Sequence, residues 1–170
     1  INYSEGIPLS CVSVSLWKKA RPLLGVIYDF NRDHLYAGIA GAGASLNGTP
    51  IRVRSFRGPS EAILCTGFPA AMDLSESEVR RFVARVSQFR KIRMLGTAAL
   101  SLAFVAAGFV DAYYEKSIKI WDVAAGLALV EAAGGEIMCS GFPESHIVEA
   151  SAGASRACLV NGISIRDSVS

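Results

Sequence analysis

Short apolar stretches separated by tight turns fill the first third of the chain. Over residues 12–17 apolar residues recur at every second position, the period of a half-buried strand. Apolar runs over residues 23–30 and 35–39 follow, and Asn47-Gly48 is a strong signal for a further hairpin. Because the turns between these runs are too short for crossovers, the pattern predicts an antiparallel meander of strands.

From about residue 59 onward, strand-like runs alternate with stretches of helical periodicity. Such alternation predicts a sheet with helices packed against it. Gly58-Pro59-Ser60 is the expected boundary between residues 1–58, part of a first lobe, and residues 59–170, a second α/β lobe. Small and polar residues over 141–155 predict a surface loop. Strands are expected at residues 62–66, 92–95, 110–115, 136–139 and 157–160, and helices at 75–89, 97–107 and 122–133.

The composition is that of a core-forming domain that neither crosses a membrane nor binds nucleic acid. Hydrophobic residues make up 51% of the 170 residues, so some apolar surface is expected to face a partner subunit or a segment outside this chain. No apolar run reaches the roughly 20 residues that a bilayer requires. The net charge is only +2. The clustered basic residues predict a solvated helix face, with a weak anion contact as the alternative; they are Arg80, Arg81, Arg85, Arg90, Lys91 and Arg93.

Cysteines and histidines form no metal-binding pattern in the sequence. No Cys-x-x-Cys pair occurs, so a zinc site is not expected. The cysteines are interpreted as reduced, buried residues, which is consistent with a cytoplasmic protein. His34 and His146 stand alone on polar turns and are expected to be structural or exposed. The four cysteines are Cys11, Cys65, Cys139 and Cys158.

Two expected strand-to-helix junctions carry the candidate chemistry. At the first, Gly96 and Thr97 precede an apolar helix, and at the second Asp122 lies at or near a helix N-cap. Helix N-termini bind phosphate through exposed N–H groups, but Thr97 and Asp122 are also ordinary capping residues. Glu115 ends the strand between the junctions, and pairing with Lys116 or Lys119 is the alternative to a binding role. Trp121 is expected to be a core anchor rather than a substrate platform.

The motifs at these junctions resemble those of the inositol monophosphatase family, a family of magnesium-dependent, lithium-sensitive phosphatases. The most specific one is Trp121-Asp122-Val123-Ala124-Ala125-Gly126 with its trailing Glu131-Ala132-Ala133-Gly134-Gly135. The resemblance covers nearly the whole chain in the same order. It also includes Gly96-Thr97-Ala98-Ala99, Asp111-Ala112-Tyr113-Tyr114-Glu115, Gly25-Val26-Ile27-Tyr28-Asp29, Leu35-Tyr36-Ala37-Gly38, Gly41-Ala42-Gly43-Ala44-Ser45-Leu46-Asn47-Gly48 and Ile51-Arg52-Val53.

The resemblance implies a fold, a reaction and a role for each candidate residue. The implied fold is a layered α/β sandwich of the αβαβα type, with an antiparallel meander sheet followed by a second sheet with alternating helices. The implied reaction is Mg²⁺-dependent hydrolysis of a small phosphorylated polyol or sugar by a homodimer. Asp122 would bind the metal, Gly96, Thr97 and Ala98 would contact phosphate or substrate, and Glu115 would accept hydrogen bonds from a substrate hydroxyl. Inositol monophosphate is the first expectation, and fructose-1,6-bisphosphate and 3′-phosphoadenosine nucleotides are alternatives.

The chain departs from the family at its start. Ile1-Asn2-Tyr3 resembles the residues that follow the family's Asp-Pro-x-Asp-Gly-Thr motif, which supplies two metal-binding aspartates. That motif and an upstream glutamate do not occur in residues 1–170. A polypeptide limited to these residues is therefore expected to lack Mg²⁺-dependent activity, since Mg²⁺ binding requires several converging carboxylates or phosphates. A non-catalytic fragment or assembly module is the alternative of another class.

Overall fold

The structure, a computed structural model, describes residues 1–55, 58–68, 73–156 and 159. Most of this part of the chain forms two five-stranded sheets, which are layered with helices. The first sheet contains β1 (Val12–Lys18), β2 (Arg21–Asp29), β3 (His34–Ile39), β4 (Gly43–Leu46) and β5 (Thr49–Ile51). The second contains β6 (Ile63–Thr66), β7 (Lys91–Arg93), β8 (Ala112–Lys119), β9 (Glu136–Ser140) and β10 (Ile147–Gly153).

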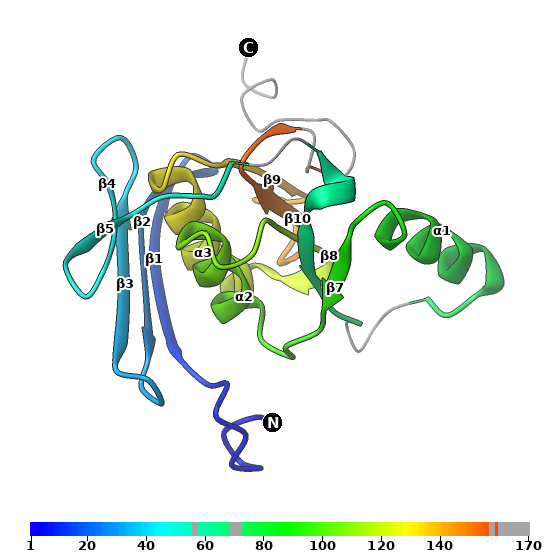
Figure 1. Ribbon diagram of the computed structural model, residues 1–170, viewed down its shortest axis with the longest axis horizontal. Helices are drawn as coiled ribbons and strands as arrows, with labels where there is room; N and C mark the ends of the chain where they lie inside the picture. Colours follow the sequence, from blue (N-terminus) through cyan, green and yellow to red (C-terminus); the bar gives the residue numbers. More distant parts are fainter. Residues whose placement is uncertain (56–57, 69–72, 157–158, 160–170) are drawn as a thin grey trace.

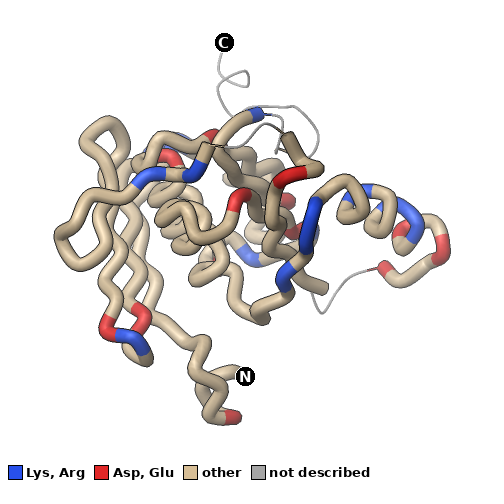
Figure 2. Tube along the Cα trace, in the orientation of Figure 1, with Lys and Arg blue, Asp and Glu red and all other residues tan. Residues whose placement is uncertain are grey.

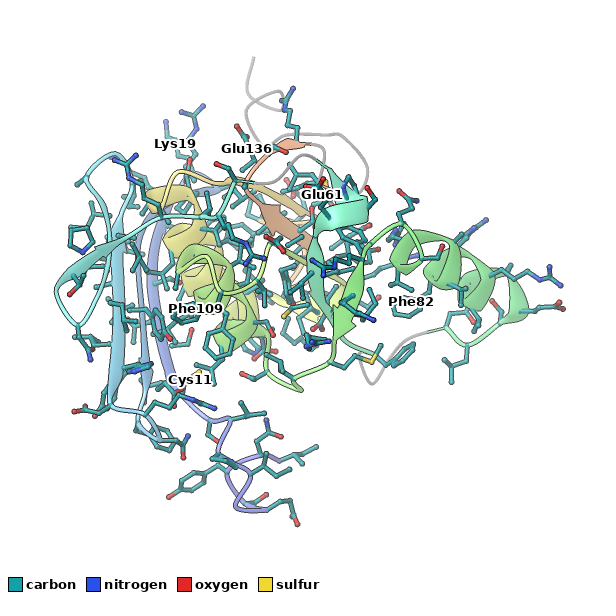
Figure 3. All side chains as sticks on the ribbon, in the orientation of Figure 1. Cys11, Lys19, Glu61, Phe82, Phe109 and Glu136 are labelled. Atoms are coloured by element: carbon teal, nitrogen blue, oxygen red, sulfur yellow. The ribbon has the colours of Figure 1, made fainter. Side chains whose placement is uncertain are left out.

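The helices form the layers between and beside the sheets (Figure 1). Helices α2 (Ala98–Ala106) and α3 (Ile120–Ala132) lie between the two sheets, where α3 contacts strands of both. Helix α1 (Glu76–Val86) packs on the opposite face of the second sheet, where Val86 adjoins buried Leu64 and Tyr114. Phe82 of α1, labelled in Figure 3, packs on Phe68 with ring centroids 4.8 Å apart. A short 3₁₀ helix, Pro59–Glu61, precedes β6.

The first sheet is the antiparallel meander that the sequence predicts. Its strand order follows the chain, and the β4–β5 turn places Asn47 and Gly48 at φ values of 49° and 79°, as a tight hairpin turn requires. In β1, however, the side that carries the aliphatic residues is the exposed one. Ser13, Ser15 and Trp17 face the helices, whereas Val12, Val14 and Leu16 are exposed on the outer face.

The second sheet corrects one sequence prediction. Residues 141–155 are not a surface loop, because they include β10, which lies between β8 and β9 in the strand order β7-β6-β8-β10-β9. The residues of β10 are small because the strand lies inside the sheet beneath α3, with Ala150, Ser151 and Ala152 fully buried. The strand expected at 157–160 lies outside the described residues except for Leu159.

Helix and strand boundaries shift by a few residues at the second junction. β8 continues to Lys119 rather than ending at Glu115, and α3 begins at Ile120 rather than at Asp122. The other elements lie within a few residues of their expected positions. The division into lobes at Gly58-Pro59-Ser60 stays a prediction.

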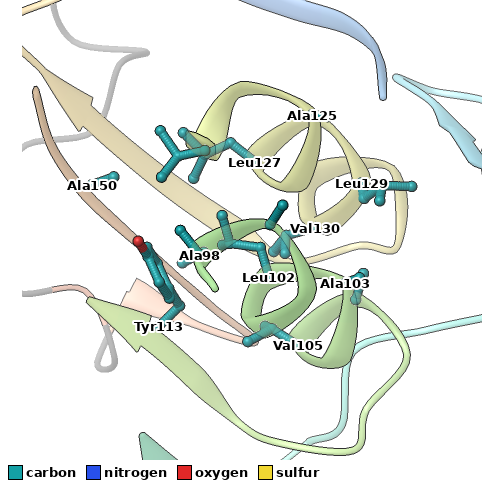
Figure 4. Packing of buried hydrophobic residues seen from close by; sticks show 14 of the residues in the cluster. Ala98, Leu102, Ala103, Val105, Tyr113, Ala125, Leu127, Leu129, Val130 and Ala150 are labelled. Carbon is teal, nitrogen blue, oxygen red and sulfur yellow. The ribbon is translucent and has the colours of Figure 1, made fainter. Parts of the chain in front are cut away.

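The core is the close contact of α2 and α3 with each other and with both sheets (Figure 4). Both helices are apolar around most of their circumference, as helices buried on all sides must be. Glycines permit the close approach. A Cβ on Gly126 of α3 would lie 2.3 Å from Cβ of Leu102, and one on Gly25 of β2 would lie 2.2 Å from the carbonyl oxygen of Ala125.

The basic cluster is only in part the helix face that was expected, because Arg80, Arg81 and Arg85 lie on α1 whereas Arg90, Lys91 and Arg93 lie before and in β7. Acidic residues precede basic ones along α1 (Figure 2), and on the surface Arg80 pairs with Glu76 and Arg81 with Glu78. Arg85 differs, because its guanidinium lies 4.3 Å from the ring centroid of Tyr114 and donates to the Tyr114 hydroxyl. In the described part of the chain, none of the helices is long and apolar enough to cross a membrane.

Candidate active site

A cavity of about 450 Å³ opens where three segments meet: the residues before β1, the turn into α2 and the first turn of α3. Four of the five residues singled out in the sequence line it, namely Gly96, Thr97, Ala98 and Asp122. Glu115 is not among the lining residues. The cavity is also lined by Asn2, Cys11, Ile118 and Trp121, and Trp121 is 58% exposed there rather than the core anchor that was expected.

The turn into α2 presents the start of a helix to this cavity. Gly96 has a φ of +68°, a left-handed conformation that glycine adopts without strain, and it turns the chain from β7 into α2. Thr97 occupies the N-cap position with an extended backbone, but its hydroxyl makes no capping hydrogen bond. The alternative that Thr97 is the N-cap residue is therefore confirmed by position, although its side chain satisfies no N–H group of the helix. The N–H groups of the first turn of α2 carry partial positive charge and suit an anion.

Asn2 holds this turn and was missed by the sequence analysis. Its side-chain amide donates to the carbonyl oxygen of Gly96 at 3.2 Å and to that of Leu9 at 3.0 Å. Asn2 thus ties the amino-terminal segment to the turn across 94 residues of sequence. A contact between residues so far apart leaves no local pattern that one sequence could reveal.

Asp122 lies in the first turn of α3 rather than at its N-cap, which is Lys119. Asp122 thus lies near the N-cap, as expected, but its carboxylate makes no hydrogen bond or ion pair within the described residues and does not cap the helix. Partial burial raises the pKa of Asp122, and the nearby Lys119 ammonium acts in the opposite direction. A carboxylate without a protein partner that faces a cavity is suited to bind a cation.

Glu115 belongs to β8 of the second sheet, lies near Asp122 of α3 and is only 9% exposed. Burial raises its pKa to about 7; a hydrogen bond with Tyr113 opposes this, and the charge of Asp122 adds to it. Glu115 makes no ion pair with Lys116 or Lys119 in the described residues, and Lys116 instead pairs with Glu78 at 3.2 Å. The surface ion pair considered for Glu115 is therefore wrong.

Gly67 provides the space for the Glu115 side chain. A Cβ at Gly67 would lie 2.8 Å from Oε1 of Glu115, so a larger residue would displace the carboxylate. Gly67 has no signature in the sequence, because its contact joins the loop after β6 to β8, far along the chain.

The described residues do not make up a complete metal site. No group of three or more His, Cys, Asp or Glu side chains gathers in the described ranges. Asp122 fits a single ligand position for a hard cation such as Mg²⁺.

None of the three described cysteines, of which only Cys11 lines the cavity, is suited to thiolate chemistry. Burial raises the thiol pKa of Cys11 and Cys65 to about 11 and that of Cys139 to about 12. A protonated thiol is a poor nucleophile and a poor metal ligand. These three residues are free and at least partly buried, as the sequence predicts, and Cys158 lies outside the described residues.

Comparisons with known proteins agree with this arrangement. Residues 1–158 match the family described as the inositol monophosphatase family. Nus factor SuhB from Xylella fastidiosa is 42% identical over 137 residues, which cover 80% of this chain and 50% of that protein. Inositol-1-monophosphatase from Mesorhizobium japonicum is 38% identical over 138 residues, which cover 79% of this chain and 51% of that protein.

A solved structure extends the agreement to three dimensions. Inositol monophosphatase from Anabaena (Nostoc) superposes with a TM-score of 0.81 and 35% identity over 91% of this chain and 62% of that one. Its fold agrees with the two sheets and intervening helices described above, and so confirms the layered sandwich. The chain spans about half the length of the curated relatives it matches. The match over nearly all of its length shows that the chain belongs to the inositol monophosphatase family.

Proposed function

We propose that the protein containing this chain is a Mg²⁺-dependent phosphatase of small phosphomonoesters, with inositol monophosphate as the first candidate substrate. The observation that carries the proposal is the meeting of an unpartnered Asp122 carboxylate and the Gly96–Thr97 turn at one cavity. Two helix N-termini and a carboxylate at one cavity suit a phosphate group bound together with a cation. The names of relatives, among them Inositol-1-monophosphatase, support the same substrate class.

In this proposal each residue has a distinct task. The first-turn N–H groups of α2 and the Thr97 hydroxyl bind the phosphate oxygens. Asp122 would be one ligand of a Mg²⁺ ion, which would supply charge neutralisation and an activated water. Glu115 accepts a hydrogen bond from a hydroxyl of the substrate and selects polyols. The remaining metal ligands would come from residues outside this chain.

The decisive experiment replaces Asp122 in a protein that also carries a relative's amino-terminal half. A chimera with that half of the Anabaena enzyme joined before Ile1 provides it. Asp122→Asn should lower turnover of inositol 1-phosphate by at least ~100-fold at saturating Mg²⁺, because a lost ligand removes charge stabilisation. Asp73→Asn, in the exposed segment before α1, is the matched control. Near wild-type turnover of the Asp122 variant would refute the role.

Glu115 should affect specificity more than turnover. Glu115→Gln should raise KM for inositol 1-phosphate, with a smaller loss on an aryl phosphate that lacks hydroxyl groups. Equal losses on both substrates would count against the proposed hydroxyl contact.

A second candidate function is a non-catalytic assembly module, and the observation that favours a function besides catalysis is that several relatives are named Nus factor SuhB. The two functions separate cleanly in the chimera. Phosphatase activity that depends on Asp122 supports the enzyme, whereas a folded, inactive chimera counts against the enzyme and leaves the assembly module as the alternative. A cytoplasmic location, inhibition by lithium and a homodimer remain parts of the proposal, and lithium titration and sedimentation of the same chimera test the last two. Polypeptide 1–170 alone should show no Mg²⁺-dependent turnover, since it supplies one carboxylate.

A further inference from the structure

A fully buried aspartate ends the helix-facing side of β2. Gly25, Ile27 and Asp29 alternate along the buried side of this strand. A buried carboxylate is costly unless charged or hydrogen-bonding groups surround it. Asp29 is not among the residues that line the candidate active site, so the proposed function leaves this buried charge without a task.

The turn after β2 supplies the partners of this carboxylate. Arg32 donates from Nη1 to Oδ2 of Asp29 at 2.7 Å. Oδ1 of Asp29 accepts from the backbone N–H of Asn31 at 3.1 Å and from the side-chain amide of Asn31 at 3.4 Å. Hydrogen bonds to a charged group are the stronger ones, so the carboxylate fixes the orientation of both side chains.

The same two side chains hold the segment that leads into β1. Nη1 of Arg32 also donates to the carbonyl oxygen of Pro8 at 3.2 Å, and the amide of Asn31 also donates to that of Ser10 at 3.0 Å. Residues 8–10 belong to no helix or strand, so no backbone ladder fixes them. The position of this segment therefore depends on side chains that Asp29 orients.

This segment forms one wall of the candidate active site. Residues 9–11 line the cavity. Asn2 continues the connection, because its amide donates to the carbonyl oxygens of both Leu9 and Gly96. A series of hydrogen bonds thus leads from Asp29 through the wall to the turn into α2, where the phosphate is proposed to bind.

We propose that Asp29 is a positioning residue for the phosphatase reaction and acts through Asn31 and Arg32 on this cavity wall. The inference rests on the proposed function and adds to it a group that touches neither phosphate nor metal. Ile1 also lines the cavity, so the half joined before it in the chimera enters the site beside this wall. Because a displacement of about 1 Å can lower a rate about 100-fold, a loosened wall should reduce turnover before it weakens substrate binding.

Steady-state kinetics of the chimera with and without Asp29→Asn test this role. The variant keeps the shape of the side chain but loses the charge that holds Arg32. We expect kcat for inositol 1-phosphate to fall about 10-fold and KM to stay within about 2-fold, because the phosphate-binding start of α2 is held by the core instead. Asp33→Asn is the matched control in the same turn and should keep both constants. Asp33 is exposed and accepts from the Tyr28 hydroxyl at 2.8 Å.

Three further variants separate positioning from a general loss of stability. Arg32→Lys keeps a cation that can donate to both Asp29 and Pro8, so its kcat should stay within about 3-fold of wild type. Arg32→Met should lose as much turnover as Asp29→Asn. Asn31→Ala removes the bond to Ser10 at an exposed position without altering the buried charge, and it should lower kcat about 3-fold.

Hydrogen exchange of the same proteins gives a readout that requires no activity. Exchange at residues 2–11 should become at least about 5-fold faster in Asp29→Asn, whereas exchange in α1, on the far face of the second sheet, should not change. Faster exchange throughout the protein would indicate a purely structural role and would overturn the inference.

The outcomes separate this inference from the proposed function. Turnover that depends on Asp122 but is kept in Asp29→Asn would overturn the positioning role and leave the phosphatase standing. A rise in KM without a fall in kcat, or an Arg32→Lys variant no more active than Arg32→Met, would also overturn it. If the chimera is inactive, the phosphatase fails, and unchanged exchange at residues 2–11 in Asp29→Asn would then overturn the wall contact as well.

Discussion

The two sheets carry similar apolar sequences but differ in what covers them. The second sheet lies between α2 and α3 on one face and α1 on the other, and Leu64 is fully buried. The first sheet packs on α3 with one face only. Its outer face exposes Val14 at 55% and Leu16 at 57%. Figure 2 shows its strands almost free of charge, with charged residues near the turns.

This difference accounts for the apolar excess of the composition. In antiparallel pairs, residues opposite each other point to the same side, so the registers place Val14 beside Val26 and Val26 beside Ala37. The outer face of the first sheet is therefore a continuous apolar surface that no described residue covers. Such surfaces mark contacts with other protein segments or a liability to aggregate. The alternation of apolar and polar residues along a strand indicates that the two faces of the sheet differ, but it does not tell which face the helices cover.

The largest expected effect contrasts one leucine from each sheet. Leu64→Ala should destabilise the protein by about 2–5 kcal/mol, because it opens a cavity in a fully buried position. Leu16→Ala, on the outer face of the first sheet, should cost no more than about 0.5 kcal/mol. Urea unfolding of both variants measures the difference. Similar losses would mean that something covers the outer face in solution.

The buried Glu115 should make stability depend on pH through the second sheet. A carboxyl whose pKa is raised to about 7 in the folded state binds its proton more tightly there than in the unfolded chain. Its contribution is therefore fully present in acid and is lost as the pH rises from about 4.5 to about 7, by up to about 3 kcal/mol. Unfolding with a chelator present should show that Glu115→Gln removes this decline, whereas Glu76→Gln on the surface of α1 retains it. An unchanged decline in Glu115→Gln would contradict the assignment.

The covered face of the first sheet should be far more sensitive than its outer face to one added methyl group. Gly25→Ala should destabilise by about 1–3 kcal/mol, because the new Cβ would lie 2.2 Å from the carbonyl oxygen of Ala125. Val26→Ala, the next residue on the same strand, points the other way and should cost less. Thermal unfolding compares the two. A tolerant Gly25 would show that α3 can move away from the sheet.

The smallest expected effect concerns association through the outer face. Polypeptide 1–170 should self-associate through this face and through β1, an edge strand in the described sheet. Val14→Lys should weaken association about 10-fold or more by sedimentation, because a charge would be buried in the contact. Val79→Lys, on the exposed surface of α1, is the control. A monodisperse wild-type polypeptide would refute this prediction.

The sequence predicted the elements whose signals are local. The Asn47-Gly48 turn, the meander and the buried α2 and α3 follow from residues next to each other in the chain. β10 was missed because its small residues, Ala150 to Gly153, have the composition of a loop and become a strand only through pairing with β8 and β9.

The candidate site was predicted in part for the same reason. The Gly96–Thr97 turn and Asp122 belong to local motifs, and they meet at one cavity. Asn2 and Gly67 act through contacts with Gly96 and Glu115 far along the chain, so no pattern in a single sequence reveals them. The position of Asp122 within the first turn, rather than at the cap, depends on the extension of β8 to Lys119.

Helix α3 is held by contacts in which one partner has no side chain. The helix backbone packs against Gly25 on one side, and Leu102 packs against Gly126 on the other. The position of the start of the helix, and of Asp122 with it, therefore depends on the absence of a Cβ atom at these two glycines. In evolutionary terms, selection at such positions acts against gaining a methyl group rather than against losing a contact. Neutral drift would be blocked at these glycines although they perform no chemistry. A natural variant with alanine at Gly25 or Gly126 would have a displaced Asp122 carboxylate.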